Sequence, residues 1–361
     1  MLRPKHCCNK TDWQAFKPLG ARKSFTTRRV DFTDVKGLLR SAKPAAGDLV
    51  LARVEVIGQH ARLEEHLGRR AKLYPGDEII VAYGARYAPD QFEAEVPADL
   101  SPCDLVAGGG VAARVLSRHS RMSKATRISP VGLLLDAQGQ TINLRHYALP
   151  ETTTVPNISP RVMAVVGSSM NAGKTTTAAG LVHGLARAGL RVAGIKVTGT
   201  GSGGDLWSMA DAGAEWTLDF TDMGHATTAG LPEAEVERIA TGLVRHTASL
   251  GADIIILEVA DGLFQRETGA LVGSHSFHRM VDGVVFAAGD ALGAIGGIEW
   301  LRQRGLPVIA LSGLLTASPL AMREAAAHSE VPVMTLTELL DPHSATRLCF
   351  GHSPQHMAQV A

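Results

Sequence analysis

The chain has 361 residues, which is more than one ordinary domain needs and enough for two. Apolar residues make up 45% and charged residues 20%, so the composition supports a buried core and excludes intrinsic disorder. No apolar run approaches the ~18 residues of a membrane span, and the N-terminal segment lacks the apolar stretch of a secretory signal. With only four cysteines, these features predict a cytoplasmic protein without a disulfide framework.

The net charge of +1 conceals two halves of opposite charge. Residues 1–150 carry 23 Lys and Arg against 15 Asp and Glu, and the remainder carries 13 against 20. Near neutrality of the whole chain argues against a general polyanion binder. The split indicates a basic domain followed by an acidic one.

The basic half is predicted to be a small β-rich, barrel-like domain over residues 23–150, after an N-terminal tail at 1–22. Short apolar runs at 48–57, 78–83, 131–136 and 141–144 are typical of strands. Turn signals separate them, including Pro75-Gly76-Asp77 and three consecutive glycines at 108–110. A proline- and threonine-rich stretch at 151–160 is typical of a linker.

Two features of this half are candidate binding elements. Five cations lie close together in the sequence, namely Arg114, Arg118, Arg121, Lys124 and Arg127. They can bind a phosphorylated or carboxylated substrate, a neighbouring subunit's nucleotide or nucleic acid, or they form a solvated face opposite the acidic domain. The lack of interleaved aromatic residues disfavours nucleic acid. His6-Cys7-Cys8 resembles a metal-ligand segment but lacks a second pair at suitable spacing.

The acidic half, at residues 161–345, shows apolar strands alternating with amphipathic helices. Strands are expected at 162–166, 191–197, 254–258, 283–287 and 308–311, and helices at 174–188 and 233–250. This order predicts an α/β fold with a mostly parallel sheet covered on both faces. Residues 346–361 are expected to be a tail.

The strongest motif is a phosphate-binding loop between the first strand and helix of this half. Small residues allow backbone N–H groups to turn toward phosphate oxygens, and the helix N-terminus adds partial positive charge. Lys174 supplies a cation for the β- and γ-phosphates, and the Thr175 hydroxyl can ligate Mg²⁺. Five residues rather than four separate the two glycines. The predicted nucleotide-binding residues are Gly167, Ser168, Ser169, Met170, Asn171, Ala172, Gly173, Lys174, Thr175 and Thr176.

Two further segments end strands of the same predicted sheet. Glu258 closes an apolar strand and is followed by Asp261, so a carboxylate is placed to hold Mg²⁺ beside the loop. Lys196 closes another strand and is followed by a glycine- and hydroxyl-rich loop that leads to Asp205, a further candidate metal ligand. Either acid can instead cap a turn, and the lysine loop can be a solvated surface loop. His225, His275 and His278 are candidate bases with no feature that distinguishes them from surface histidines.

The segments GSSMNAGKTT, GIKVTGTGSGGD and IILEVADG together resemble the dethiobiotin synthetase-like branch of P-loop NTPases. This branch includes cobyric acid amidases, an accessory GTPase of molybdopterin-guanine dinucleotide synthesis, and P-loop proteins of DUF1611 type, some of them linked to N-acylation of amino acids. The resemblance covers roughly residues 160–340 and extends to the five-residue spacing of the loop. It implies that Lys196 contacts substrate, that Glu258 is the strand-end acid, and that the protein is a homodimer.

The sequence also departs from its relatives. Gly167-Ser168-Ser169 replaces a Gly-Thr-Asp segment, and the second loop lysine of partitioning ATPases is absent. Leu311-Ser312-Gly313-Leu314 stands where a guanine-reading Asn-Lys-x-Asp motif would follow the late strand, which favours ATP over GTP.

These features predict an ATP- and Mg²⁺-dependent kinase or ligase that transfers the γ-phosphoryl group to the carboxylate, carbamate or hydroxyl of a small anionic metabolite. Thr175, Asp205 and Glu258 position the metal in this hypothesis. Lys174 and Lys196, with Thr198 or Thr200, stabilise the transferring group. The alternative is a nucleotide-switched accessory protein that acts on a partner protein.

Overall fold

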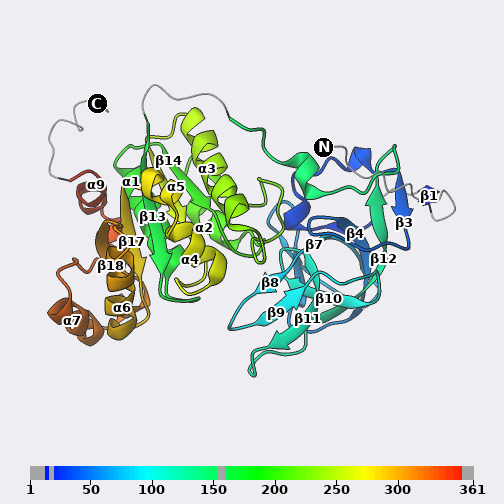
Figure 1. Ribbon diagram of the computed structural model, residues 1–361, viewed down its shortest axis with the longest axis horizontal. Coiled ribbons are helices and arrows are strands. Elements are labelled where there is room, and N and C mark those ends of the chain that lie inside the picture. Colours follow the sequence, from blue (N-terminus) through cyan, green and yellow to red (C-terminus); the bar gives the residue numbers. More distant parts are fainter. Residues whose placement is uncertain (1–12, 16–19, 153–158, 352–361) are drawn as a thin grey trace. The chain divides into compact units, whose positions relative to one another are not determined.

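The computed structural model describes residues 13–15, 20–152 and 159–351. By its internal contacts the chain divides into two units (Figure 1). Unit 1 comprises Met1–Leu149, Thr200–Gly203 and Thr221–Ala229, and unit 2 comprises Pro150–Gly199, Gly204–Phe220 and Gly230–Ala361. The candidate metal ligands His6, Cys7 and Cys8 lie outside the described residues.

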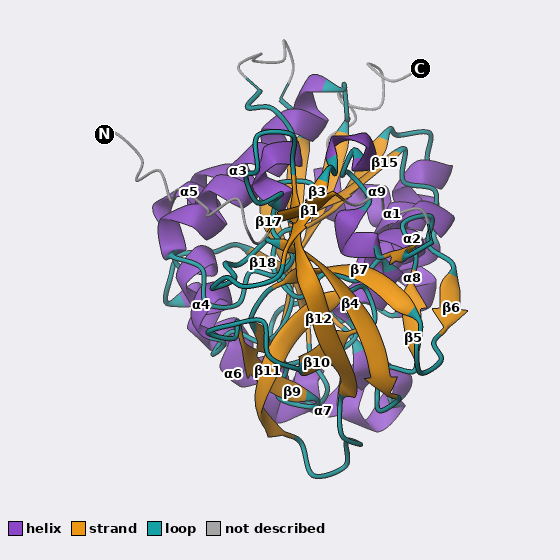
Figure 2. Ribbon diagram, turned by 90° about the vertical axis from the view of Figure 1, so that its right-hand side faces the viewer, coloured by secondary structure: helices purple, strands orange, loops and turns teal. Residues whose placement is uncertain are grey.

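Unit 1 contains a β-sheet that closes on itself (Figure 2). Strand β12 pairs with β4, β4 with β7, β7 with β11, β11 with β10, and β10 again with β12. This closed path confirms the prediction of a β-rich, barrel-like domain. The strands are β1 (Trp13–Ala15), β2 (Arg22–Lys23), β3 (Gly37–Leu39), β4 (Leu49–Val56), β5 (Arg62–Glu64), β6 (Arg70–Lys72), β7 (Glu78–Tyr83), β8 (Arg86–Tyr87), β9 (Phe92–Glu95), β10 (Cys103–Ala107), β11 (Val111–Arg118) and β12 (Thr126–Leu135).

Both faces of the central strands are buried in unit 1. On β4, Leu49 and Leu51 pack with Val30 and Leu38, whereas Val50 and Ala52 belong to a second cluster on the opposite face. Since successive side chains of a strand point to opposite faces, two cores produce continuous apolar runs rather than alternation.

One expected strand of unit 1 is wrong. Residues 141–144 form two isolated bridges, Thr141 with Leu135 and Asn143 with Asp48, and a 3₁₀ helix begins at Leu144 and runs to Tyr147. The cause is Asn143, whose side chain accepts a hydrogen bond from the Arg145 N–H and so starts the helical turn. Three other 3₁₀ segments are described, at Phe25–Thr27, Phe32–Asp34 and Leu314–Ala317.

Unit 2 is built on a six-stranded, fully parallel sheet in the order β15-β14-β16-β13-β17-β18. This arrangement confirms the predicted α/β fold with a parallel sheet. The strands are β13 (Arg161–Gly167), β14 (Val192–Lys196), β15 (Trp216–Asp219), β16 (Ile254–Glu258), β17 (Gly283–Ala287) and β18 (Val308–Ser312). The helices are α1 (Lys174–Arg187), α2 (Gly204–Asp211), α3 (Glu233–Ser249), α4 (Arg266–Val272), α5 (His275–Met280), α6 (Ala291–Arg302), α7 (Pro319–His328), α8 (Leu336–Leu340) and α9 (Pro342–Phe350).

Helices cover both faces of this sheet. Apolar residues of α1, α2, α8 and α9 form one cluster with Val165, Ile256 and Val285 of the strands. The other face carries α3 against β14–β16 and α6 against β17 and β18. Among the described residues, no helix is long and apolar enough to cross a membrane.

The segments that follow β14 and β15 belong to unit 1. The Gly201 N–H donates to the Ala226 carbonyl at 2.8 Å, and Glu64 accepts hydrogen bonds from the Ser202 hydroxyl and the Gly203 N–H at 3.2 and 2.9 Å. Arg28 donates to Thr221 and forms an ion pair with Asp222 at 2.5 Å. The two units are therefore not contiguous in sequence, unlike the division expected at residues 151–160.

Two neighbouring glycines of α6 allow a matched test of packing. A Cβ at Gly297 would lie 2.0 Å from the ring of the fully buried Phe286, whereas a Cβ at Gly296 meets nothing within 4 Å. We expect Gly297→Ala to lower the free energy of unfolding by about 1–3 kcal/mol through overpacking. Gly296→Ala is expected to raise it by about 0.5–1 kcal/mol, because alanine favours the helix.

Urea denaturation of the two variants against wild type measures the difference. Equal stability of the two variants would contradict the close packing of α6 on β17.

Candidate nucleotide and metal site

The phosphate loop connects the end of β13 to the start of α1. Gly173 has φ 94° and caps the N-terminus of α1, and Asn171 has φ 62°, so the loop reverses through left-handed backbone. The Lys174 ammonium donates to the Ser169 carbonyl at 2.7 Å. A Cβ at Gly167 would lie 2.8 Å from Lys174 Cγ, so glycine there leaves room for the lysine stem.

Neighbouring loops of unit 2 fix the back of the phosphate loop. The Leu314 N–H donates to the Ala172 carbonyl at 2.9 Å, and a Cβ at Gly313 would lie 2.3 Å from that same oxygen. A Cβ at Gly262 would lie 2.5 Å from the Ser168 carbonyl. The segments after β16 and β18 therefore lie directly against the loop, as the carboxyl edge of a parallel sheet requires.

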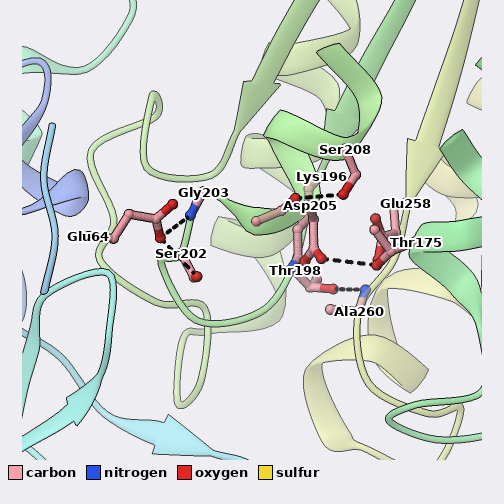
Figure 3. Close-up of polar contacts among 11 residues, drawn as sticks. Glu64, Thr175, Lys196, Thr198, Ser202, Gly203, Asp205, Ser208, Glu258 and Ala260 are labelled. Carbon is pink, nitrogen blue, oxygen red and sulfur yellow. Dashed lines mark hydrogen bonds and ion pairs between the residues drawn. The ribbon is translucent and has the colours of Figure 1, made fainter. Parts of the chain in front are cut away.

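Thr175 lies at the centre of a small polar cluster (Figure 3). Its hydroxyl is 3.0 Å from Asp205 Oδ1 and 2.9 Å from Glu258 Oε1. One hydroxyl carries one proton, so it can donate to only one of the two carboxylates at a time. The remaining contact needs a shared proton or a cation.

The two acids of this cluster differ in pKa. Burial, with the nearby Asp205 carboxylate acting in the same direction, raises the pKa of Glu258 to about 7. Burial also acts to raise the pKa of Asp205, but Lys196, Thr175 and Lys174 together outweigh it and the pKa is lowered. Asp205 is therefore the ionised partner, and Glu258 holds a proton more readily.

Lys196, at the end of β14, forms an ion pair with Asp205. Burial acts to lower the pKa of Lys196, but the carboxylates of Asp205, Glu258 and Asp219 outweigh it and the pKa is raised. Lys174 differs because burial lowers its pKa, and the acids, Glu258 first, offset this only in part. Both lysines are buried: 6% of the surface of Lys174 is exposed, and 7% of that of Lys196.

The residues present fit a magnesium ion bound together with phosphate. Glu258 is 2% exposed, and its Oε2 has no hydrogen-bond partner. No group of three or more His, Cys, Asp or Glu among the described residues is arranged to hold a metal by itself. Two carboxylates and a threonine hydroxyl are the donor set with which proteins bind Mg²⁺ when phosphate oxygens and water supply the other ligands.

The structure separates the two threonines predicted to contact substrate. The buried Thr198 hydroxyl accepts a hydrogen bond from the Ala260 N–H at 2.9 Å. Thr200 instead forms a β-bridge with Thr227 within unit 1. Thr176 is exposed at the first turn of α1. Asp261, after β16, has φ 63°.

Two of the five cations of the cluster in unit 1 are paired with acids. Arg114 forms an ion pair with Glu95, Arg127 pairs with Asp104 at 3.2 Å, and Arg118 donates to the Met122 carbonyl. Arg118 and His119 line a hollow of about 280 Å³. The arginines are thus spread along β11, β12 and their connection. The candidate histidines lie elsewhere: His225 is buried in unit 1, and His275 and His278 belong to α5.

Two contributors to the site were missed from sequence. Asp219 ends β15, is fully buried and pairs in register with Lys196. Gly313 holds the phosphate loop through its lack of a side chain. The sequence features that could have indicated them are the short run at 216–219, which ends in Asp219, and the glycine that follows the strand at 308–311.

No protein-family model matches the chain, and no curated protein sequence matches it significantly. Among solved structures it is similar to the signal recognition particle 54 kDa protein of Aeropyrum pernix K1 in complex with GDP, with 21% identity, a TM-score of 0.36, and coverage of 57% of this chain and 49% of that one. The signal recognition particle receptor FtsY of Elizabethkingia anophelis in complex with GDP is 15% identical, with a TM-score of 0.35, and the match covers 57% of this chain and 68% of that one. The kinase domain of Escherichia coli tyrosine kinase ETK is 16% identical, with a TM-score of 0.32, and the match covers 43% of this chain and 68% of that one.

The chain thus spans about half the length of the first of these proteins. At these TM-scores the similarities say nothing about substrate or reaction.

The raised pKa of Glu258 predicts a pH-dependent stability difference. Since the pKa rises from an ordinary value of 4.5 to about 7 on folding, the stability it contributes is present at low pH and lost as pH rises through 7. Glu258→Gln does not ionise. We therefore expect its melting temperature, relative to wild type, to increase from pH 5 to pH 8 in the presence of a chelator.

Thermal unfolding at a series of pH values tests this, with the exposed Glu324→Gln on α7 as a control that shows no such trend. A Glu258→Gln difference that is flat with pH would show that the carboxylate is already ionised at low pH.

Proposed function

We propose that the chain binds MgATP at residues 167–176 and transfers the γ-phosphoryl group to a small metabolite, as a kinase or ligase. The observation that carries this proposal is the Thr175 cluster. A threonine hydroxyl in the first turn after a phosphate loop lies within hydrogen-bond distance of two carboxylates, one of which has an unpartnered buried oxygen. This arrangement fits a cation held between protein and phosphates.

The loop residues have separate tasks in this proposal. Backbone N–H groups of residues 167–175 cradle the phosphates. The Lys174 ammonium exchanges the Ser169 carbonyl for the β- and γ-phosphate oxygens, which are stronger acceptors. Thr175, Asp205 and Glu258 hold Mg²⁺, which neutralises negative charge that develops on the phosphates.

Lys196 stabilises the transferring group in this proposal. Its ion pair with Asp205 keeps the ammonium charged in a buried site. It therefore offers a fixed positive charge beside the metal ligands, at no cost of reorganisation during the reaction. The Thr198 hydroxyl lies on the turn after β14 and supports this edge of the site.

The sequence after β18 supports ATP as the nucleotide. Ser312, Gly313 and Leu314 replace the polar residues of the guanine-reading motif. Relationship to the dethiobiotin synthetase-like branch, the anionic nature of the metabolite, homodimer formation and cytoplasmic location stay predictions from sequence.

One observation favours the second candidate, a nucleotide-switched accessory protein. Thr200–Gly203, between Thr198 and Asp205, is bound within unit 1 through Glu64. A displacement of Asp205 on nucleotide exchange would therefore be transmitted along the chain to Thr200–Gly203, which is the coupling that a switch requires. A switch hydrolyses ATP slowly and changes its affinity for a partner, whereas an enzyme consumes ATP in proportion to a metabolite product.

The two lysines provide matched variants. Lys174→Ala is expected to weaken MgATP binding and to lower turnover by ~10²-fold or more, since it removes a buried cation from the phosphates. Lys196→Ala is expected to retain nucleotide affinity nearly intact and to lose metabolite-stimulated turnover. Calorimetric titration with MgATP and an ADP-release assay across a metabolite panel measure both properties.

Turnover that persists in Lys174→Ala would refute the proposed nucleotide site. If Lys196→Ala lost only ATP affinity, Lys196 would be assigned to nucleotide binding rather than to the metabolite.

A further inference from the structure

Asp261 follows a residue whose backbone N–H and carbonyl are both hydrogen-bonded to threonine side chains. The preceding residue, Ala260, donates its N–H to Thr198 Oγ1 at 2.9 Å and accepts a hydrogen bond from the Thr268 hydroxyl at 2.8 Å. Both threonines are buried, with 1% and 0% of their surface exposed. The turn after β14 and helix α4 therefore set the direction in which the chain leaves Ala260.

The backbone of Asp261 is strained. Its φ of 63° is left-handed, and Asn171 of the phosphate loop is the other non-glycine residue with positive φ in the part of the chain that the structure describes. Glycine adopts this conformation without the clash that a Cβ causes, and glycine occupies the other described positions with positive φ. Strain of this kind persists where the surroundings impose it and collects at functional sites.

The strained segment lies against the phosphate loop. Gly262 approaches so closely that a Cβ there would lie 2.5 Å from the Ser168 carbonyl and 3.0 Å from Ser169 Cα. Lys174 is held at the same segment, since its ammonium donates to the Ser169 carbonyl at 2.7 Å. Asp261 thus shares the edge of the site with the lysine assigned to the β- and γ-phosphates.

The local charges restrict what can accept a phosphoryl group there. Lys196 is already ion-paired with Asp205, and Glu258 is a further acid of the cluster. An additional carboxylate at Asp261 repels an anionic acceptor group and favours one that donates a hydrogen bond. This observation selects among the hydroxyl, carbamate and carboxylate acceptors that the sequence left open.

We propose that Asp261 is a catalytic residue that accepts a hydrogen bond from the O–H of the phosphoryl acceptor, and that the substrate is therefore a hydroxyl-bearing metabolite. This proposal rests on the proposed function. The acceptor atom forms a bond to Pγ, the bond from Pγ to the β–γ bridging oxygen breaks, and ADP leaves with that electron pair. The acceptor proton passes to the Asp261 carboxylate and then to solvent.

Thr198 and Thr268 act as positioning residues in this scheme. They hold the Ala260 peptide, which holds the Asp261 backbone in its strained conformation. Thr198→Val keeps the shape of the side chain and removes the hydroxyl, so the Ala260 N–H loses its partner. Thr198→Ser restores the hydroxyl.

The test uses the full chain with MgATP and water as acceptor, measured as ADP release, and the MgATP analogue with a β–γ imido bridge as a binding probe. Asp261→Asn and Asp261→Gly are expected to lower turnover by ~10²-fold or more, with affinity for the analogue unchanged. Asp261→Gly is also expected to melt at a higher temperature than wild type, because glycine relieves the strain. Thr198→Val lowers turnover and Thr198→Ser recovers it.

Turnover of Asp261→Gly close to wild type would overturn this inference while leaving the proposed function intact. So would a loss of analogue affinity in Asp261→Asn, since the carboxylate would then serve the nucleotide. Wild-type ATP turnover that does not depend on Lys174 would overturn the proposed function and this inference together.

Discussion

The burial of opposite charges at one edge of a parallel sheet is the constraint around which unit 2 is organised. Removing a lysine or a carboxylate from water costs several kcal/mol unless a partner compensates it. Lys196 forms an ion pair with Asp205, and Lys174 donates a hydrogen bond to the Ser169 carbonyl. One oxygen of Glu258 has no hydrogen-bond partner. In the proposed function a bound cation would pair with this oxygen, and the stability given up at such a site would contribute to affinity.

Backbone geometry around this cluster is fixed by residues that contribute no chemistry. Gly313 and Gly262 let the loops after β18 and β16 touch the phosphate loop, where any side chain would collide with a carbonyl. Buried threonine hydroxyls tie the loop after β16 to its neighbours. Precision in the site thus comes from close backbone contacts and from hydrogen bonds to peptide groups, both of which are stiffer than long side chains.

Local patterns were sufficient for the apolar strands of unit 2 and for helices α1 and α3. The strands at 254–258 and 283–287 and helix α1 were predicted within a residue, and the phosphate loop lies where its glycines indicate. Short elements were missed, because β15 and α2 have too few residues for a periodic signal. Residues 141–144 were misassigned because the capping geometry of Asn143 is decided by its neighbours rather than by apolar content. Pairings between distant residues, such as Lys196 with Asp219 and Glu64 with Gly203, depend on topology that no local window contains.

The interleaving of the two units constrains how this protein can have been assembled. Two short segments that follow strands β14 and β15, Thr200–Gly203 and Thr221–Ala229, have partners in unit 1, at Glu64 and Arg28. A contiguous fragment that begins after the linker would carry both loops without those partners and would expose the Gly203 N–H and the Asp222 carboxylate. Gene fusion or domain shuffling moves contiguous pieces of sequence, so neither half can be exchanged for a foreign one without rebuilding these loops. A substitution at Glu64 or Arg28 in the barrel therefore acts on a segment that lies far away in the sequence.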